Sequence, residues 1–138
     1  MKKTRLRYRG VNDYSVLKEK IQAKLREIVI KRDKGCILRD YPETGKCDSV
    51  LQAEHLLSRA ESSTFSDTRN IVCLCRKHHI FWKPTNSLCY WEIVEEMIGV
   101  KRWEWLQKMK QYQSRHIAQK HDLKLELLAL EMELKRMK

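Results

Sequence analysis

The sequence predicts an α+β fold, in which a small core of two strands and a helix lies between flanking helices. The evidence is an amphipathic helical pattern before residue 34, short apolar runs between residues 36 and 75, and helical patterns after residue 86. The chain has 138 residues, of which 42% are hydrophobic, with only four glycines and two prolines. This composition is globular and allows one modest core.

The N-terminal segment, residues 1–34, combines a basic arm with an amphipathic helix that begins near Asp13. Apolar residues recur along the helix at steps of three and four, at positions 16, 17, 21, 25, 28 and 29. Gly35 lies six residues after the last of these positions and directly after Lys34, where we expect the helix to end. We expect this glycine to take the left-handed conformation that commonly ends a helix.

The central segment, residues 35–84, has a different pattern. Residues 36–54 indicate an extended piece, a polar turn around Pro42 and Gly45, and a strand that ends near His55. A Ser/Thr-rich loop and a second strand at "IVCLC" follow. A short helix is then expected to begin around Arg76 and to end before Pro84.

The C-terminal segment, residues 85–138, is predicted to be helical. Asn86 or Ser87 caps a helix that Gly99 ends, and one further helix runs from about Lys101 to the C-terminus. Its last part carries an apolar seam of about two heptads, formed by Leu123, Leu127, Leu130, Leu134 and Met137. The seam either joins two copies into a homodimer, which we favour, or packs back on residues 14–33 of its own chain.

The net charge of +11 is unevenly distributed along the chain. Residues 1–34 carry 12 Lys and Arg against 4 Asp and Glu, residues 35–103 carry equal numbers, and residues 104–138 carry 8 against 5. Basic flanks around a neutral middle favour a nucleic acid as a partner over a merely solvated surface. No apolar run suggests a membrane span or a signal peptide, so we expect a cytoplasmic protein whose five cysteines are ligands or core residues.

A short-spaced pair, Cys75 and His78, and a widely spaced pair, Cys36 and Cys47, predict a structural zinc site. Cys75 and His78 have the Cys-x-x-His spacing of a ligand pair, at a strand-to-helix turn. Cys36 and Cys47 supply the second pair, because a loop of eleven residues can still bring its ends together. The alternative is that these two cysteines are small buried hydrophobic residues.

The remaining two cysteines are interpreted as core residues. Cys73 is the less certain of them, because it lies two residues before Cys75 and therefore faces the same side of a strand. It is the alternative ligand in place of Cys75 or Cys47. Cys89 stands among apolar residues of a predicted helix, which favours a buried position.

A second cluster begins with Glu54 and His55 at the predicted end of the first strand. A carboxylate can bind a hard divalent cation, and a neighbouring imidazole can take a proton from water. The two residues alone are weak evidence for metal-assisted hydrolysis. Their significance depends on Asn70, which precedes the second strand, and on His79, which follows Asn70 by nine positions.

This arrangement resembles the HNH, or ββα-metal, nuclease family over residues 36–83. In that family an Asp-His or His-His pair ends the first strand, an asparagine precedes the second, and a histidine or asparagine follows nine positions later. Five features agree in order and spacing, namely Glu54-His55, Asn70, Cys75, His78 and His79. The stretches "IVIKRDKGC" and "EEMIGVKRWEWL" are similar to phage recombination nucleases of the NinG type, which implies a bacterial or phage-encoded protein in the host cytoplasm.

The resemblance implies a metal-dependent DNA endonuclease and a role for each residue. His55 is the general base, and Glu54 and His79 hold one Mg²⁺ or Mn²⁺ ion. Asn70 holds the loop that orients His55, and Arg59 contacts the scissile phosphate. His78 belongs to the zinc site while His79 belongs to the catalytic site, because adjacent helix residues differ by about 100° in direction.

Two features depart from the family pattern. Glu54 stands where a shorter residue is more usual, and Lys83 stands where some members have a further metal-binding histidine. A charged lysine cannot bind a metal ion, so the site has two protein ligands, which favours Mg²⁺ or Mn²⁺ over a transition ion. The competing interpretation is a non-catalytic, zinc-stabilised DNA-binding module.

Overall fold

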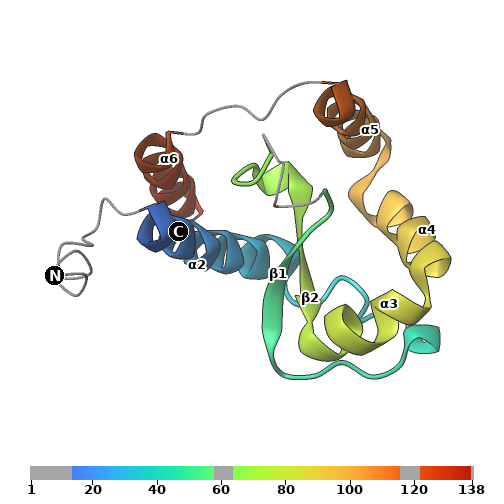
Figure 1. The fold of residues 1–138 in the computed structure, drawn as a ribbon. Helices are drawn as coiled ribbons and strands as arrows, with labels where there is room; N and C mark the ends of the chain where they lie inside the picture. The colour runs from blue at the N-terminus through green and yellow to red at the C-terminus, as the bar shows by residue number, and fades with distance from the viewer. Residues whose placement is uncertain (1–13, 58–63, 116–121, 138) are drawn as a thin grey trace, which may run out of the picture.

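The structure, a computed structural model, describes residues 14–57, 64–115 and 122–137. Its centre is an antiparallel pair of strands, β1 (Leu51–His55) and β2 (Ile71–Cys75), in which Leu51 pairs with Cys75 and His55 with Ile71 (Figure 1). All five residues of β2 are buried, because helices cover both sides of the hairpin. The combination of helices with a small sheet confirms the α+β class.

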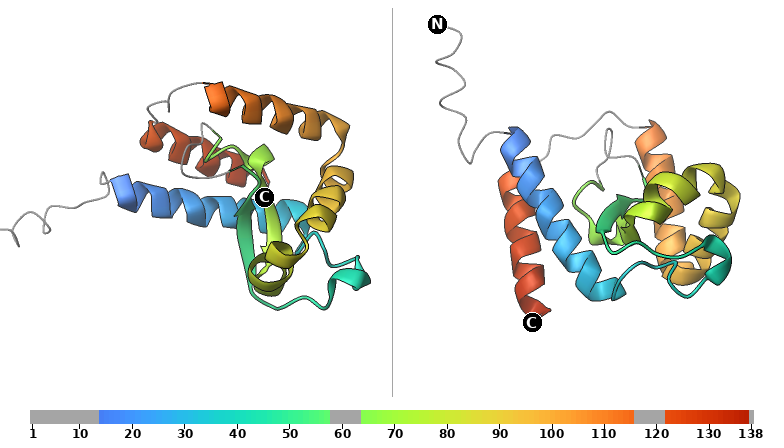
Figure 2. Two further views of the ribbon diagram at one scale, coloured as in Figure 1. Left: turned by 45° about the vertical axis from the view of Figure 1, so that its right-hand side comes forward. Right: turned by 90° about the horizontal axis from the view of Figure 1, so that it is seen from below.

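Helices α2 (Tyr14–Asp33) and α6 (Leu123–Arg136) lie side by side on one face of the hairpin (Figure 2). They share a core with the sheet formed by Leu17, Ile21, Leu25, Ile28, Val29, Phe65, Ile71, Cys73, Leu123, Leu130 and Leu134. The turn after α2 uses two residues with positive φ, Lys34 at 59° and Gly35 at 117°. The left-handed position therefore lies one residue earlier than predicted.

The apolar seam of α6 packs on α2 of the same chain. Leu123, Leu130 and Leu134 are buried there, and Leu127 is partly buried against them. This is the intramolecular arrangement that the sequence left open. Dimerisation through the C-terminal helix stays a prediction, and a second copy would have to use a surface other than the one α2 covers.

The prediction of one helix from Lys101 to the C-terminus is wrong. Helix α5 spans Val100–Arg115, and α6 begins separately at Leu123. The side chain of Asp122 caps α6 by accepting a hydrogen bond from the backbone N–H of Leu125 at 3.1 Å. Asp122 could have been recognised as a capping residue, but the sequence has no glycine or proline nearby that would indicate a break between two helices.

Helices α4 (Ser87–Ile98) and α5 lie on the other side of the hairpin (Figure 1). A second core forms there from Cys36, Ile37, Leu38, Leu56, Val72, Leu74, Cys75, Tyr90, Ile93, Val94 and Leu106. Gly99 follows α4 with a φ of 86°, as predicted, and Asn86 takes the position before α4, although its side chain makes no capping hydrogen bond. Cys89 is exposed, so its assignment to the core is wrong.

Two 3-10 turns lie in the described segments that join these elements. A 3-10 turn η1 (Pro42–Thr44) precedes β1, and another, η2 (Thr68–Asn70), precedes β2. Residues 37–40 form turns, so the extended piece predicted after Cys36 is wrong; β1 and β2 are the strands of the described chain. None of the described helices combines the length and the apolar content required to cross a membrane.

The helix after β2 runs from Arg76 into α3 (Lys83–Thr85), with a π-helical segment η3 (His78–Trp82) between. It was expected to end before Pro84. It continues to Thr85, with Pro84 as the second residue of α3, directly after the π-helical segment. Both adjacent histidines belong to η3, and π-helical segments are frequent at functional sites.

Candidate metal centre and the adjoining cavity

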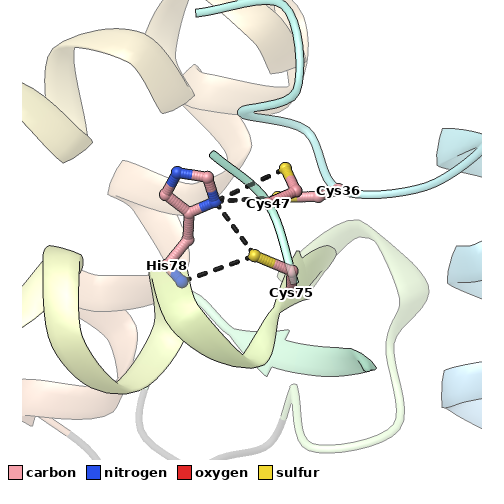
Figure 3. A group of neighbouring side chains, drawn as sticks. All are labelled: Cys36, Cys47, Cys75 and His78. Atoms are coloured by element: carbon pink, nitrogen blue, oxygen red, sulfur yellow. Dashed lines mark hydrogen bonds between the residues drawn. The ribbon is translucent and has the colours of Figure 1, made fainter. Parts of the chain in front are cut away.

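Three cysteines and one histidine meet between the loop after α2 and the helix after β2 (Figure 3). The ligand atoms of Cys36, Cys47, Cys75 and His78 all lie within 4.8 Å of one another. The Nδ1 atom of His78 is 3.0 Å from the sulfur of Cys75, 3.5 Å from that of Cys36 and 3.7 Å from that of Cys47. The four predicted ligands are therefore brought together, from segments up to 42 residues apart.

These distances fit a tetrahedral zinc ion. Zinc binds sulfur at about 2.3 Å and nitrogen at about 2.0–2.1 Å, which places the ligand atoms of a tetrahedron about 3.5 Å apart. The hydroxyl of Thr44 donates to the Tyr41 carbonyl at 2.7 Å, so its oxygen accepts from Nε2–H of His78 at 3.0 Å. This places the lone pair of His78 on Nδ1, toward the three sulfurs.

Burial makes the thiols of this group dependent on a cation. Removal from water, with smaller contributions from neighbouring Cys75 and Cys47, raises the pKa of the Cys36 thiol to about 12. A cysteine binds a cation as the thiolate, so a bound ion would replace the proton of this Cys36 thiol. Two buried thiols and one exposed thiol facing one imidazole nitrogen therefore form a set of donors that could hold a metal ion such as zinc.

Cys73 does not belong to the metal group. Its side chain faces the core shared by α2 and α6, and its backbone N–H donates to Asp33 at 2.9 Å. Burial, and then the charge of Asp33, raise the pKa of its thiol to about 12. The ambiguity between Cys73 and Cys75 is resolved because β2 ends at Cys75, where the chain turns into the helix that carries His78.

The second cluster forms around Glu54, whose side chain is nearly buried on β1. One of its oxygens contacts Nε2 of His79, and the other accepts a hydrogen bond from the ammonium of Lys83 at 2.5 Å. On the other side of the ring, Nδ1 of His79 donates to the side-chain oxygen of Gln52 at 2.7 Å. Gln52 and Glu54 are two residues apart on one strand face, so together they fix the orientation of His79.

His55 occupies the end of β1 and is held through its imidazole. Its Nε2 donates to the carbonyl of Phe65 at 2.9 Å, and the Phe65 ring stacks on the imidazole at 5.4 Å with an interplanar angle of 9°. Nε2 therefore carries a proton, and Nδ1 is the nitrogen that can accept one when the ring is neutral. A histidine in this tautomer is oriented to accept a proton at Nδ1.

Asn70 joins the end of β1 to the start of β2. Its side chain is fully buried; its oxygen accepts from the backbone N–H of Leu57 at 2.7 Å, and its amide nitrogen lies 3.3 Å from the Leu57 carbonyl. The Asn70 carbonyl accepts from the N–H of Leu56 at 2.8 Å. Asn70 thus fixes the two residues that follow His55 through hydrogen bonds to their backbone.

Two arginines hold the segment that carries Asn70. Arg32 of α2 donates to the carbonyls of Thr68 and Ile71, and Arg102 of α5 donates to those of Arg69 and Ile71. Burial, and then the charge of Arg32, lower the pKa of Arg102 to about 10. Both guanidinium groups act here as multiple donors to backbone oxygens, so their role is structural.

A cavity of about 680 Å³ opens between α2, β1 and the helix after β2. Glu54, His55 and His79 line it together with Gln52, Lys83 and α2 residues that include Gln22 and Arg26. Arg59 lies outside the described residues, so its predicted role has no structural counterpart here. Gln52 was missed by the sequence interpretation, although its spacing of two from Glu54 on a strand could have identified it.

Comparison with known proteins adds no relative. No family model matches the chain. No curated protein and no solved structure matches it either. The functional interpretation therefore depends on the geometry of the two clusters and on the pattern of residues in the sequence.

Proposed function

We propose that the protein is a metal-dependent endonuclease of the HNH type that hydrolyses phosphodiester bonds of DNA. The observation that carries this proposal is the convergence of Glu54, His55 and His79 on one cavity, with Asn70 fixing the chain behind His55. A buried carboxylate, an oriented base and an oriented second imidazole are the groups that metal-assisted phosphodiester hydrolysis requires.

His55 is the general base in this proposal. Its Nε2–H is held by the Phe65 carbonyl, so Nδ1 takes the proton of the attacking water. The strand end and the Asn70 side chain keep the imidazole at the cavity wall. Such positioning matters because small displacements of a reacting group cost large factors in rate.

Glu54 and His79 are the residues that would hold a divalent ion. The Nε2 atom of His79 and an oxygen of Glu54 face one another. The side-chain oxygen of Gln52 accepts a hydrogen bond from Nδ1–H of His79, as groups behind metal-binding histidines commonly do. An oxygen and a nitrogen donor fit Mg²⁺ or Mn²⁺ that retains water ligands. When bound, the ion stabilises the charge that develops on the phosphate and on the leaving oxygen.

The zinc cluster supports this arrangement from behind. His78 and His79 are neighbours at the start of one helix, so an ion bound by Cys36, Cys47, Cys75 and His78 fixes the helix that presents His79. We propose a structural role for this zinc, because four protein ligands complete a tetrahedron and leave no position for water.

A second candidate is a zinc-stabilised DNA-binding module without catalysis. The observation that favours it is the ion pair between Lys83 and Glu54, which already neutralises the carboxylate without any metal ion. The module requires only the zinc cluster and the basic flanks. It leaves the fixed tautomers of His55 and His79 without a purpose, and we rank it second for that reason.

The deciding experiment is plasmid cleavage by the wild-type protein and by His55→Ala, with Mg²⁺ or with Mn²⁺. We expect the substitution to lower the cleavage rate about 10²–10⁴-fold, the usual contribution of a general base. Zinc content and thermal midpoint should match those of the wild type, which controls for loss of the fold. Wild-type protein that retains its zinc but cleaves no DNA with either ion would favour the binding module.

A further inference from the structure

One face of α2 forms a third wall of the cavity. Lys18, Gln22 and Arg26 are spaced four residues apart and therefore lie on one side of this helix. Gln22 and Arg26 line the cavity that contains Glu54, His55 and His79. The ammonium of Lys18 lies 5.1 Å from the centre of the Phe65 ring, which itself stacks on His55. We call these three α2 residues the α2 wall.

Arg26 is anchored on one edge only. Its Nε donates to the Leu51 carbonyl at 2.8 Å, at the first residue of β1. Within the described part of the chain, its two terminal nitrogens make no hydrogen bond, and the residue is exposed. A guanidinium held in this way presents a fixed pair of donors outward, which is the geometry that recognises a phosphate group.

Lys18 provides a second cation at the other end of β1. It stands near Phe65, beside the strand-end residue His55, whereas Arg26 stands at Leu51. Eight residues of helix separate the two by about 12 Å. This length corresponds to about three or four base-pair steps of about 3.4 Å along the axis of a DNA duplex that lies parallel to α2.

The charges along the cavity suit the same ligand. Arg26 and Lys83 line it as cations, and Glu54 is the carboxylate among its lining residues. Glu54 is already paired with Lys83 and in contact with His79, so it repels an incoming phosphate only weakly. The cavity is therefore bordered by positive charge on the α2 side.

We infer that the α2 wall binds the phosphates on either side of the scissile phosphate and so sets the position of a DNA duplex over the cavity. This inference rests on the proposed nuclease function, because it takes Glu54 and His55 as the centre of the substrate. It assigns to α2 a task that the HNH motif itself does not contain. Arg26 and Lys18 provide affinity and position, while His55 provides chemistry.

The test is fluorescence anisotropy with a short labelled duplex, using the full chain with its zinc and no added divalent ion. Lys18→Ala and Arg26→Met are compared with Lys20→Ala. Lys20 is an exposed lysine on another side of the same helix, about 200° from Lys18 and about 120° from Arg26. Methionine retains the aliphatic part of Arg26, and the thermal midpoint of each variant controls for folding. We expect each wall variant to lose about five-fold in affinity at 0.15 M salt, and the salt slope to fall by about 0.9.

The control variant Lys20→Ala should retain the wild-type affinity and slope. Equal losses in Lys20→Ala and Arg26→Met would overturn the inference, since they would reflect net charge alone. Wild-type affinity in both wall variants would overturn it as well. The nuclease proposal would then still stand if the wild-type protein cleaves plasmid. Loss of affinity in the wall variants of a protein that cleaves nothing would support the DNA-binding wall while rejecting the nuclease.

Discussion

His78 and His79 are adjacent, yet they belong to clusters of opposite kinds. His78 is 1% exposed, faces three sulfurs and is held behind by Thr44. The side chain of His79 is 36% exposed and contacts one carboxylate at the wall of an open cavity. A complete donor shell is suited to holding a structural ion, whereas an incomplete shell beside a cavity leaves room for water and substrate.

The strand-to-helix turn explains how neighbours reach different sites. Cys75 ends β2, and the N–H of His78 lies 3.4 Å from the sulfur of Cys75, so the first helical turn wraps around the metal group. Adjacent residues in a helix differ by about 100° in direction. His79 consequently points toward β1, where Gln52 and Glu54 receive it.

The largest expected effect is the loss of folding when a ligand of the His78 cluster, which has the complete donor shell, is replaced. Cys75→Ser should prevent stable folding, because structural zinc contributes about 10–16 kcal/mol to small zinc domains, comparable to the whole stability of a domain. Circular dichroism and elemental analysis check this, with the exposed Cys89→Ser as matched control. A Cys75→Ser protein that folds at wild-type stability with no zinc would show that the metal is dispensable.

The next effect concerns the support of His55. Asn70→Ala should lower the free energy of unfolding by about 2–4 kcal/mol, since it leaves the N–H of Leu57 and neighbouring carbonyls without their buried partner. The cleavage rate at a temperature where the variant is folded should also fall, because the chain after His55 loses its anchor. Urea unfolding measures the first effect and plasmid cleavage the second.

Asn70→Asp separates the two groups of the amide. The aspartate retains the oxygen that accepts from Leu57, but it places a second oxygen against the carbonyls of Leu57 and Thr64. It should therefore be destabilised as well, through repulsion and not through a lost acceptor. Full stability and full activity in both variants would remove Asn70 from any positioning role.

The parts of the site set by short-range spacing were predictable from the sequence. Cys75 and His78 are three residues apart at a strand end, and Asn70 and His79 are spaced as the HNH pattern requires. The buried face of α2 follows from its three- and four-residue period, and Leu17, Ile21, Leu25, Ile28 and Val29 are all buried. Local periodicity is sufficient for features of this kind.

Features that depend on tertiary contacts were not predictable. The choice of Cys75 over Cys73 depends on where β2 ends, and strand alternation alone cannot distinguish them. The seam of α6 fits α2 or a second copy equally well, since both present apolar stripes. A single sequence does not indicate contacts between distant residues, such as the hydrogen bond from Arg26 to the Leu51 carbonyl, 25 residues away.

The smallest expected effect concerns Lys83, which distinguishes the open cluster from a full metal site. Its ammonium binds the Glu54 oxygen at 2.5 Å and lies 5.1 Å from the centre of the Tyr90 ring. A divalent ion at Glu54 must compete with this resident cation. Lys83→Met removes the competitor and leaves the carboxylate uncompensated, so affinity for Mn²⁺ should rise about three- to ten-fold.

Manganese binding is measured by electron paramagnetic resonance of the free ion, a readout independent of cleavage. Lys77→Met, an exposed lysine of the same helix, serves as the matched control, and Lys83→Arg retains the charge. Both should bind Mn²⁺ as the wild type does. Equal affinity in Lys83→Met would mean that Glu54 does not hold the ion.

Lys83→His tests the same position by adding a ligand. A third donor beside Glu54 and His79 should shift the metal preference toward Zn²⁺ or Co²⁺, because imidazole nitrogen suits these ions better than it suits magnesium.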